Sequence, residues 1–540
     1  MSEPILNGLM MDDYPLSLTT VVERSEQLTG DRKVVSRRPD GSIHRTTMGE
    51  CAGRARRLAS ALAELGIGEG DRVGTLLWNQ PEHLELYFGV PAMGSVIHTL
   101  NPRLHPDELG FIAGDAGDRA IVVDESTLPV LESFRSAHEF EHVIVVSQGG
   151  EVPEGAIDYE SLIEGAEPTS WPEPHERRAA AICYTSGTTG RPKGVLYSHR
   201  ALVLHSMAAA LPDAMNISTR DVVLPVVPMF HANAWGIPYT ASMVGAALVL
   251  PGPRLDAESV LDLLADEHVT LTAGVPTVWM AMLQAMEAEP ERWDLGSLDR
   301  LLVGGSAVPK AMIEGYQRHG LFIVQGWGMT ETSPLASTAI LPPEMDDAPA
   351  DEQLEYRARQ GVPAAFVEIS ARGDDGELIH WDDQAVGELE VRGPWVAAAY
   401  FQGTGAEKFT EDGWFQTGDV VRINRHGCIR ITDRTKDLVK SGGEWISSVD
   451  MENLLMGHSA VAEAAVIAIP DDEWGERPMA VVVLREGADA TADDLRGHLS
   501  TGFAKWQLPG RVEFIEEIPR TATGKFKKTA LREQFVKTPV

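Results

Sequence analysis

The chain has 540 residues, too many for one compact core, which predicts two or more domains. Its formal charge of −34 argues against nucleic acid or an anionic membrane as a main partner. No apolar run approaches the roughly 20 residues needed to cross a bilayer, and the first residues include acids where a secretory signal carries Lys or Arg. We therefore expect a cytoplasmic protein with no stable membrane anchor.

Three cysteines, Cys51, Cys183 and Cys428, lie far apart in the sequence. Their spacing suits neither a disulfide framework nor a zinc site. We expect all three to be small buried side chains.

Apolar, β-rich runs alternate with helical patterns through the first three quarters of the chain, which predicts layers of strands and helices. The expected strands are Val73–Leu77, Ala120–Val123, Val143–Val146, Ala181–Tyr184, Gly245–Leu250 and Arg300–Gly304. Amphipathic helices are expected at Arg54–Leu65 and Ala257–Glu267. The acidic stretch Leu341–Gln353 is expected to be a surface loop.

The pattern changes near Val386, where short strands with Gly-rich turns run to Thr432 and predict a small β-barrel or layer that closes the large domain. A second compact unit follows Asp433–Asp437. Its expected elements are the strands Ala464–Ile469, Met479–Leu484 and Val512–Ile515 and the helices Ala492–Leu499 and Thr529–Phe535. We therefore expect an α/β fold: a large N-terminal domain (1–433) of layered α/β subdomains plus the small β-barrel, a junction (434–438) and a small α+β C-terminal domain (439–540).

A dense group of glycines and hydroxyl residues directly follows the expected strand Ala181–Tyr184. The segment reads Tyr184-Thr-Ser-Gly-Thr-Thr-Gly-Arg-Pro-Lys-Gly194. Its glycines let the backbone turn N–H groups toward an anion, its hydroxyls add donors, and Lys193 supplies a mobile cation. It differs from the Walker loop because Pro192 precedes the lysine and Gly194 follows it. The segment predicts a phosphate-binding loop.

This loop resembles the phosphate loop of the acyl-adenylate-forming superfamily, which holds acyl-CoA synthetases, firefly luciferase and the adenylation domains of peptide synthetases. Further segments resemble the family's other motifs, in the family's order and over nearly the whole chain. They are Pro228–Trp235, Gly304–Ala307, Gln325–Thr332, Trp414–Asp419, Asp433–Leu438 and Pro519–Lys525. The resemblance implies an AMP-forming acid:thiol ligase, which uses ATP to activate a carboxylic acid as an acyl-adenylate and passes it to coenzyme A.

The resemblance also implies the residues that bind ATP and AMP. They are Thr185, Ser186, Gly187, Thr188, Thr189, Gly190, Lys193, Gly305, Gln325, Gly326, Trp327, Thr330, Asp419, Arg434, Lys436 and Lys440. Among them, Asp419 would accept the ribose hydroxyls and Arg434 would contact the ribose. Glu331 would hold Mg²⁺ with the Thr185 hydroxyl as a second ligand, because hard oxygen ligands suit Mg²⁺ bound partly through ATP phosphates.

Lys525 is expected to be the main catalytic cation. When a carboxylate attacks the α-phosphorus, negative charge builds on the equatorial oxygens, and a positioned ammonium stabilises that charge. The Thr-Gly-Lys spacing distinguishes Lys525 from Lys527 and Lys528. His231 lies next to the reacting centre in the family pattern, as a positioner of the acid or as a proton carrier, and Glu331 completes the catalytic set.

The family's small domain swings between an adenylating pose and a thioester-forming pose, and Lys436 matches its hinge position. Gly442 and Gly443 suit close backbone approach to the pantetheine arm of coenzyme A, and Trp445 follows them. The resemblance to one branch of the family also suggests a homodimer.

The acid is inferred from Trp235 and its neighbours. Trp235 resembles the aromatic gate of medium- and long-chain fatty acyl-CoA synthetases, and small residues beside it, including Ala232, leave room for an alkyl chain. No nearby residue carries a charge that would select an amino acid or a dicarboxylate. We therefore expect a medium- or long-chain fatty acid.

Other functions remain open on the sequence alone. The acid could be another small carboxylic acid, the acceptor could be a carrier protein, or O₂ could oxidise the adenylate as in luciferases. A non-catalytic acyl or nucleotide sensor is a further alternative. The presence of Lys525, Glu331 and Lys193 argues against the sensor, because a binding protein needs no transition-state cation.

Overall fold

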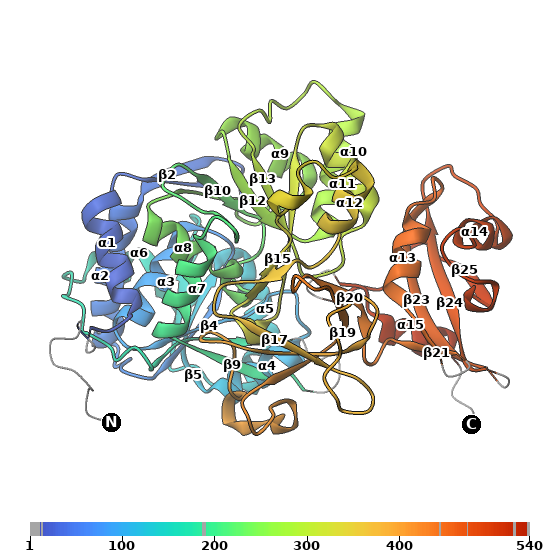
Figure 1. Cartoon of the computed structure of the whole chain (residues 1–540). Helices are drawn as coiled ribbons and strands as arrows, with labels where there is room; N and C mark the ends of the chain where they lie inside the picture. The colour runs from blue at the N-terminus through green and yellow to red at the C-terminus, as the bar shows by residue number, and fades with distance from the viewer. Residues whose placement is uncertain are drawn as a thin grey trace.

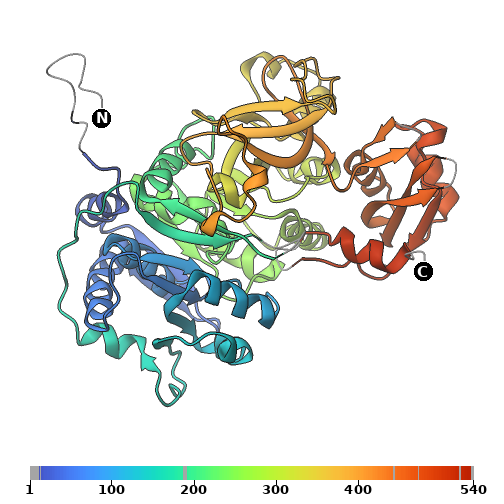
Figure 2. The same ribbon diagram turned by 90° about the horizontal axis from the view of Figure 1, so that it is seen from below.

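The computed structural model describes residues 11, 14–185, 191–441, 444–471, 474–521 and 525–536. Figure 1 shows a large body and, at one side of it, a smaller body formed by the C-terminal elements. The view from below shows the same separation (Figure 2). This arrangement confirms the expected mixed α/β fold with a large N-terminal and a small C-terminal domain, while the residue at which they divide stays a prediction.

The first large sheet has a mainly parallel centre. In order across the sheet, its described strands are β16 (Val362–Pro363), β15 (Leu335–Thr338), β14 (Phe322–Gly328), β13 (Arg300–Val303), β12 (Leu271–Gly274), β10 (Val222–Pro225), β11 (Ala247–Leu250), β1 (Lys33–Arg37) and β2 (Ile43–Thr47). Strands β14 to β11 and β1 pair in parallel, whereas β15, β16 and β2 are antiparallel additions at the two edges. The parallel strands are short apolar runs, as expected for strands buried on both faces.

The second large sheet is parallel except at one edge. Its described strands, in order, are β7 (Ile157–Asp158), β6 (His142–Val146), β5 (Asp118–Asp124), β3 (Arg72–Leu76), β4 (Val96–Thr99), β8 (Ala179–Tyr184) and β9 (Gly194–Ser198). Strand β9 returns antiparallel to β8. The phosphate-loop segment therefore connects two paired strands at the sheet edge, with Thr185 at its start and Lys193 at its end.

Helices cover these sheets (Figure 1). Those of the large body are α1 (Leu18–Thr29), α2 (Met48–Glu64), α3 (Pro81–Ala92), α4 (Pro106–Ala116), α5 (Leu128–Phe134), α6 (Tyr159–Glu164), α7 (His199–Ala209), α8 (Ile237–Val244), α9 (Ala257–Asp266), α10 (Pro276–Ala288), α11 (Lys310–Arg318) and α12 (Ala350–Arg357). Helix α2 begins before the expected Arg54 because Thr47 and Glu50 form a capping box at Met48. Helix α12 corrects the expectation of a loop at Leu341–Gln353, since that stretch ends inside a helix.

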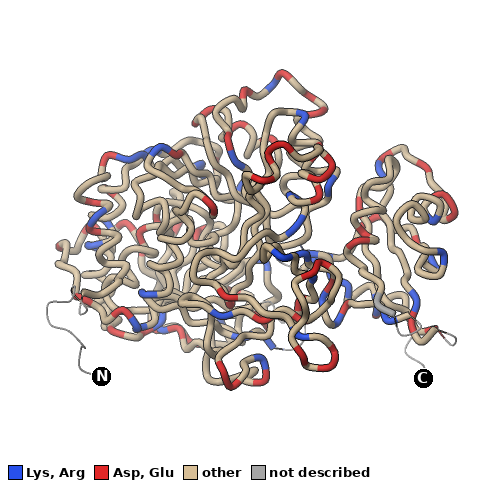
Figure 3. Tube along the Cα trace, in the orientation of Figure 1, with Lys and Arg blue, Asp and Glu red and all other residues tan. Residues whose placement is uncertain are grey.

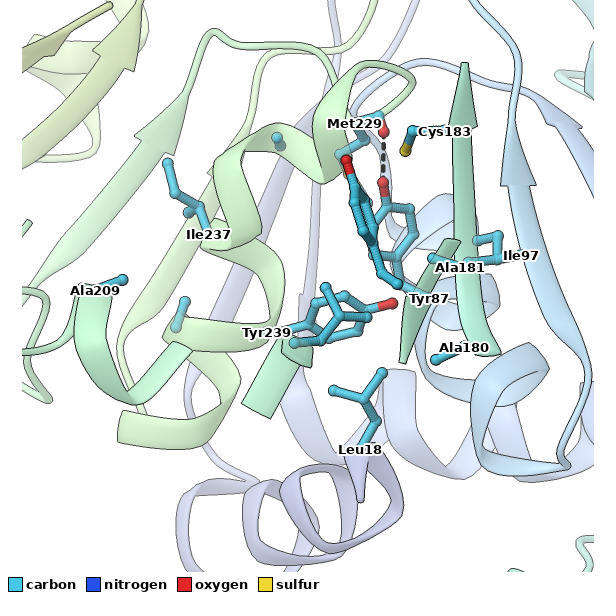
Figure 4. Close-up of a cluster of buried hydrophobic side chains, with 14 of the residues drawn as sticks. Leu18, Tyr87, Ile97, Ala180, Ala181, Cys183, Ala209, Met229, Ile237 and Tyr239 are labelled. Carbon is cyan, nitrogen blue, oxygen red and sulfur yellow. Dashed lines mark hydrogen bonds between the residues drawn. The ribbon is translucent and has the colours of Figure 1, made fainter. Parts of the chain in front are cut away.

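The largest buried cluster of the large body spans its two sheets and the smaller layer. A single cluster of buried apolar side chains includes Val73 of the second sheet, Val223 of the first and Leu389 of a smaller layer. Within it, Tyr87 of α3 and Tyr239 of α8 pack with ring centroids 5.3 Å apart. The Tyr87 hydroxyl donates to the carbonyl of Met229 (Figure 4). Buried contacts of Tyr87 thus hold the segment around Met229, which precedes α8.

The segment expected to form a small β-barrel or layer forms a layer and not a barrel. Its described strands run in the order β17 (Glu368–Arg372), β18 (Gly387–Arg392), β19 (Phe415–Ile423) and β20 (Ile429–Arg434), all antiparallel. Among the described strand pairs, none joins β17 to β20, so the layer is an open sheet. The strand signals predicted local structure but carried no information about closure.

The C-terminal body has its own core. Strands β21 (Val439–Ser441), β22 (Glu444–Ile446), β23 (Val461–Asp471), β24 (Gly475–Leu484) and β25 (Arg511–Phe514) form one sheet, with helices α13 (Ser448–Met456), α14 (Ala492–Leu499) and α15 (Lys528–Phe535). Two buried clusters lie within this body. The expected strands and helices of this unit are confirmed, and helix α13 was not predicted.

The structure bears on some of the expectations about charge, membrane spans and cysteines. Acidic positions are spread over both bodies (Figure 3). Among the described helices, none combines the length and apolar character needed to cross a bilayer. The three cysteines are buried with free thiols, as predicted. The cytoplasmic location and the homodimer stay predictions.

Gly361 joins the first large sheet to the smaller layer. Its φ is +79°, and a Cβ atom there would lie 1.8 Å from the Thr338 carbonyl oxygen. Its own carbonyl accepts the Ile429 N–H at 2.8 Å. Only glycine fits a left-handed position in such close backbone contact.

We predict that Gly361→Ala lowers the free energy of unfolding by about 2 kcal/mol more than Gly413→Ala does. Gly413→Ala is the control, because Gly413 has φ +85° but nothing within 4 Å of an added Cβ, so it should lose only the left-handed penalty of about 1 kcal/mol. Denaturant unfolding of both variants measures the difference. Equal losses would show that backbone conformation alone sets the cost.

Candidate active site

A cavity of about 740 Å³ lies where the two bodies meet the ends of the parallel strands. Strands β13 and β14 bring their carboxyl ends to it, the place where open α/β sheets bind ligands. The cavity is lined by these expected site residues: Thr185, Lys193, His231, Ala232, Trp235, Gly305, Gln325, Gly326, Trp327, Thr330, Glu331, Asp419, Arg434, Lys436 and Lys525. Segments more than 300 residues apart in sequence thus meet in one site.

The remaining expected site residues do not contribute described side chains to the cavity. Ser186, Gly187, Thr188, Thr189, Gly190, Gly442 and Gly443 lie outside the described residues, as does the side chain of Trp445. Lys440 is described, but it lies exposed on β21 and does not line the cavity. Its backbone N–H donates to Glu476 at 2.9 Å.

Asp419 is held by two donors. Its buried carboxylate accepts the indole N–H of Trp327 at 3.0 Å through Oδ2 and pairs with the Arg434 guanidinium at 2.9 Å through Oδ1. Gly418 before it has φ +75°, which forms the turn that aims the carboxylate. An ionised carboxylate has about four lone-pair positions, so both oxygens keep acceptor capacity for hydroxyl groups. Arg434, expected to contact ribose, here orients Asp419.

Glu331 and Thr185 supply the oxygen atoms expected for a metal. Glu331 is buried in a short 3₁₀ turn, Thr330–Thr332, and burial raises the pKa of its carboxyl group. Thr185 lies at the end of β8, where its N–H donates to the Lys193 carbonyl at 2.9 Å. Among the described residues, no group of three or more His, Cys, Asp or Glu could hold a metal by itself. The donors fit a Mg²⁺ ion that takes most of its ligands from ATP phosphates and water.

Lys525 reaches the cavity from the C-terminal body. The residue is exposed, but its ammonium is surrounded by protein atoms that disfavour the charged form and lower its pKa to about 8. Arg434 lowers this pKa further, whereas Asp419 and Glu331 raise it. Lys525 thus lines the same cavity as the expected ribose and metal carboxylates, where a bound polyanion would favour its charged form.

His231 is neutral near pH 7. Burial lowers its pKa to about 4, and the positive charge of Lys525 acts in the same direction. Of the two roles left open for His231, a neutral positioner of the acid fits this environment better than an imidazolium proton carrier.

The segment before α8 is a left-handed turn. Ala232, Asn233, Ala234 and Trp235 have φ between 43° and 58°. Left-handed helical conformation costs roughly 1–2 kcal/mol per non-glycine residue. Buried hydrogen bonds offset part of that cost, because the Asn233 side-chain oxygen accepts from the Tyr87 hydroxyl at 3.2 Å and from the Cys183 thiol at 3.4 Å.

The left-handed turn places Trp235 against the end of β13. A Cβ added to Gly304 would lie 3.2 Å from the indole Cη2. The half-buried indole therefore forms part of the cavity wall next to the adenine-side strand end. Ala232 is buried beside it.

Several cavity residues were not identified from the sequence. They are Asn101, Arg103, Arg191, Tyr400 and Lys408. Arg103 lies over the ring of Phe230 at 5.8 Å, and Arg191 over the ring of Phe111 at 5.1 Å. A single cation in a loop has no periodicity or spacing that marks it, so only the fold shows that these residues face the site.

Known proteins match this chain along nearly its whole length. The AMP-binding enzyme family matches residues 22–401, and the AMP-binding enzyme C-terminal domain matches residues 450–525. The chain is 49% identical over 530 residues to a long-chain-fatty-acid–CoA ligase of Thermus thermophilus, covering 97% of this chain and 96% of that protein. It is 43% identical over 536 residues to a 3-methylmercaptopropionyl-CoA ligase of Ruegeria lacuscaerulensis, covering 98% of each.

A solved structure agrees with the fold. The anthranilate CoA ligase in complex with anthranoyl-AMP superposes with a TM-score of 0.87 at 26% identity, covering 97% of this chain and 99% of that chain. The chain therefore belongs to the AMP-binding enzyme family. Within this family it is an AMP-forming acyl-CoA synthetase.

The pKa of Lys525 predicts an alkaline limit on adenylate formation. Because the charged ammonium exists below its pKa, kcat/KM for ATP in this step should fall as the pH rises above about 8. Lys525→Arg keeps its charge at all accessible pH values and should move this limb upward, at a lower rate. Pyrophosphate release without CoA, measured from pH 6.5 to 10, tests this. An identical limb in both proteins would assign it to another group.

Proposed function

We propose that this synthetase activates medium- or long-chain fatty acids. In the first step a fatty-acid carboxylate attacks the α-phosphorus of ATP, forming acyl-AMP and releasing pyrophosphate. In the second step the thiol of coenzyme A attacks the acyl carbon, forming acyl-CoA and releasing AMP. The fatty-acid assignment rests on the position of Trp235 in an otherwise apolar wall.

The wall around Trp235 supports an alkyl ligand. Apolar side chains that line the cavity include Met215, Val226, Val227, Leu302, Val324 and Leu335. Each methylene buried against such a wall contributes about 0.8 kcal/mol. Trp235 lines the cavity with this wall and its indole lies close to Gly304, so the indole would control the passage between the acid and nucleotide sides.

For the first step, each residue has a role that its position allows. Asp419 would accept the ribose hydroxyls, and Lys525 would stabilise charge on the α-phosphate. Glu331 and Thr185 would hold Mg²⁺, which when bound neutralises phosphate charge. Neutral His231 would orient the acid carboxylate. The backbone of Gly305 and Gln325–Trp327 would flank the adenine and the acyl-phosphate.

For the second step, we propose that the C-terminal body rotates at 434–438. In the present pose the Ser448 N–H donates to Asp433 at 2.7 Å, and Arg532 donates to Asp437 at 2.7 Å. Both bonds cross or flank the junction, so a rotation there must break or remake them. Such a rotation would withdraw Lys525 and bring Gly442 and Gly443 toward the acyl-adenylate.

Other acids are the second candidate. The relative named for 3-methylmercaptopropionate is nearly as similar to this chain as the one named for long-chain fatty acids. A shorter acid would fill less of the apolar wall and gain less from it. The acid panel described below separates these candidates, and comparing CoA with an acyl carrier protein as acceptor tests the remaining alternative.

We predict that Lys525→Ala slows adenylate formation at least 100-fold, because loss of one transition-state charge partner costs about 2.7–4 kcal/mol. Thioester formation from supplied acyl-AMP should change far less, since Lys525 faces the α-phosphate only in the adenylating pose. Rapid-quench assays of the two half-reactions measure this. Equal losses in both steps would contradict the assigned role.

We predict that kcat/KM of the wild type climbs with acid chain length until the apolar wall ends. Trp235→Ala should flatten the difference between medium and long chains, because the indole no longer limits entry. CoA-dependent AMP formation over saturated acids from acetate to palmitate, with benzoate included, tests this for both proteins. The fatty-acid assignment fails if acetate or benzoate outperforms octanoate in the wild type, or if the two profiles coincide.

A further inference from the structure

A tyrosine of the smaller layer contacts two of the expected ATP residues at once. The Tyr400 hydroxyl donates to Oε1 of Glu331 at 2.6 Å. The ammonium of Lys193 lies over the face of the same ring, 5.0 Å from its centroid. Glu331 follows β14 of the first large sheet and Lys193 precedes β9 of the second, so Tyr400 contacts residues from the ends of both sheets.

The smaller layer fixes the orientation of Tyr400. Its buried ring packs edge-on against Phe409 and Phe415, with centroids 5.4 and 6.4 Å away. The chain then turns at Gly405, where φ is +70° and an added Cβ would lie 2.6 Å from the Lys193 ammonium. Close backbone approach at Gly405 therefore leaves room for Lys193 above the ring.

The backbone around Glu331 is held by the same region. The Glu331 carbonyl accepts the Ala397 N–H at 2.7 Å. On the other side, the Tyr197 hydroxyl donates to the Thr330 carbonyl at 2.7 Å. Glu331 is therefore held both at its backbone and at one carboxylate oxygen, and the residue lines the cavity.

We propose that Tyr400 is a positioning residue for the metal and phosphate side of the site. Its hydroxyl sets the orientation in which Glu331 offers an oxygen to Mg²⁺, and its ring holds the Lys193 ammonium at the cavity. A hydrogen bond to an ionised carboxylate is strong and directional. A cation over an aromatic face is attracted to it by the ring quadrupole. Tyr400 contributes no ligand atom of its own.

Two variants separate the contribution of the hydroxyl from that of the ring. Tyr400→Phe removes the hydroxyl and keeps the ring beneath Lys193. Tyr400→Leu removes both. Tyr316→Phe is the matched control, because Tyr316 is a buried tyrosine whose hydroxyl donates to the Trp279 carbonyl at 2.7 Å and which does not line the cavity.

Calorimetric titration with ATP, without any carboxylic acid and therefore without turnover, reads both effects. In EDTA, Tyr400→Phe should bind ATP like the wild type, and Tyr400→Leu about threefold more weakly, because only the latter loses the ring under Lys193. With MgCl₂ added stepwise, both variants should need roughly tenfold more Mg²⁺ for half of the full affinity gain, the usual effect of removing a partner of a metal ligand. Tyr316→Phe should match the wild type in both series.

A double-mutant cycle assigns the effect to Glu331. In a Glu331→Gln background, Tyr400→Phe should no longer change the Mg²⁺ requirement. The proposal is overturned if Tyr400→Phe gives the wild-type Mg²⁺ requirement, if its effect persists with Glu331→Gln, or if it weakens ATP binding equally in EDTA.

The inference rests on the proposed roles of Glu331 and Lys193, and the wild type tests those roles separately. If Mg²⁺ did not strengthen ATP binding to the wild type, the proposed metal site would fail before Tyr400 entered the question. If Mg²⁺ strengthened binding and Tyr400→Phe left that gain unchanged, Tyr400 alone would be misassigned.

Discussion

The Asp419 carboxylate, held between the Trp327 indole and the Arg434 guanidinium, is the interaction on which the site depends. Trp327 belongs to β14 of the first large sheet, Asp419 to β19 of the smaller layer, and Arg434 ends β20 where the chain leaves for the C-terminal body. A buried carboxylate requires such partners, because an unpaired charge out of water is strongly unfavourable. The smaller layer is therefore fixed against the sheet at the point from which the C-terminal body starts.

This anchor also sets the electrostatics of the cavity. Arg434, Lys436 and Lys525 converge on it from the junction and the C-terminal body, in a chain whose net charge is −34. Desolvation lowers the pKa of both lysines, the positive charge of Arg434 lowers it further, and Asp419 counters part of the shift. A cluster of cations held in place before a polyanion arrives stabilises charge without having to reorganise.

The sequence predicted the elements whose signals are local. Apolar runs placed β3, β5, β6, β8 and β13 within a residue or two, and most of the site residues expected from the motifs line the cavity. Features that depend on contacts between distant segments escaped prediction. Whether the strands of the smaller layer close into a barrel depends on which strands pair, and local strand signals do not encode that pairing. The role of Tyr400 depends on its contacts with Glu331 and Lys193, which are distant in sequence.

Local propensity also failed where tertiary contacts overrule it. The left-handed turn contains two alanines and a tryptophan, none of which favours positive φ, so Asn233 is its one weak local signal. Hydrogen bonds from Tyr87 and Cys183 to the Asn233 side chain stabilise a left-handed conformation that Ala and Trp do not favour by themselves. Conversely, the acids and prolines of Leu341–Gln353 gave a loop signal, although helix α12 begins within that stretch.

The separate cores of the two bodies bear on how this protein unfolds. The buried clusters of the C-terminal body draw only on residues from Val439 onward, and the clusters of the large body draw on residues before it. Two such units need not melt together, so without ligand the free energy of unfolding is defined for each unit and not for the chain as one. A nucleotide held by Asp419 on one unit and Lys525 on the other would bind the joined native state alone. It would thereby add cooperativity to folding, by linking two units that are otherwise joined only through contacts at the junction such as Ser448 with Asp433 and Arg430 with Asp450.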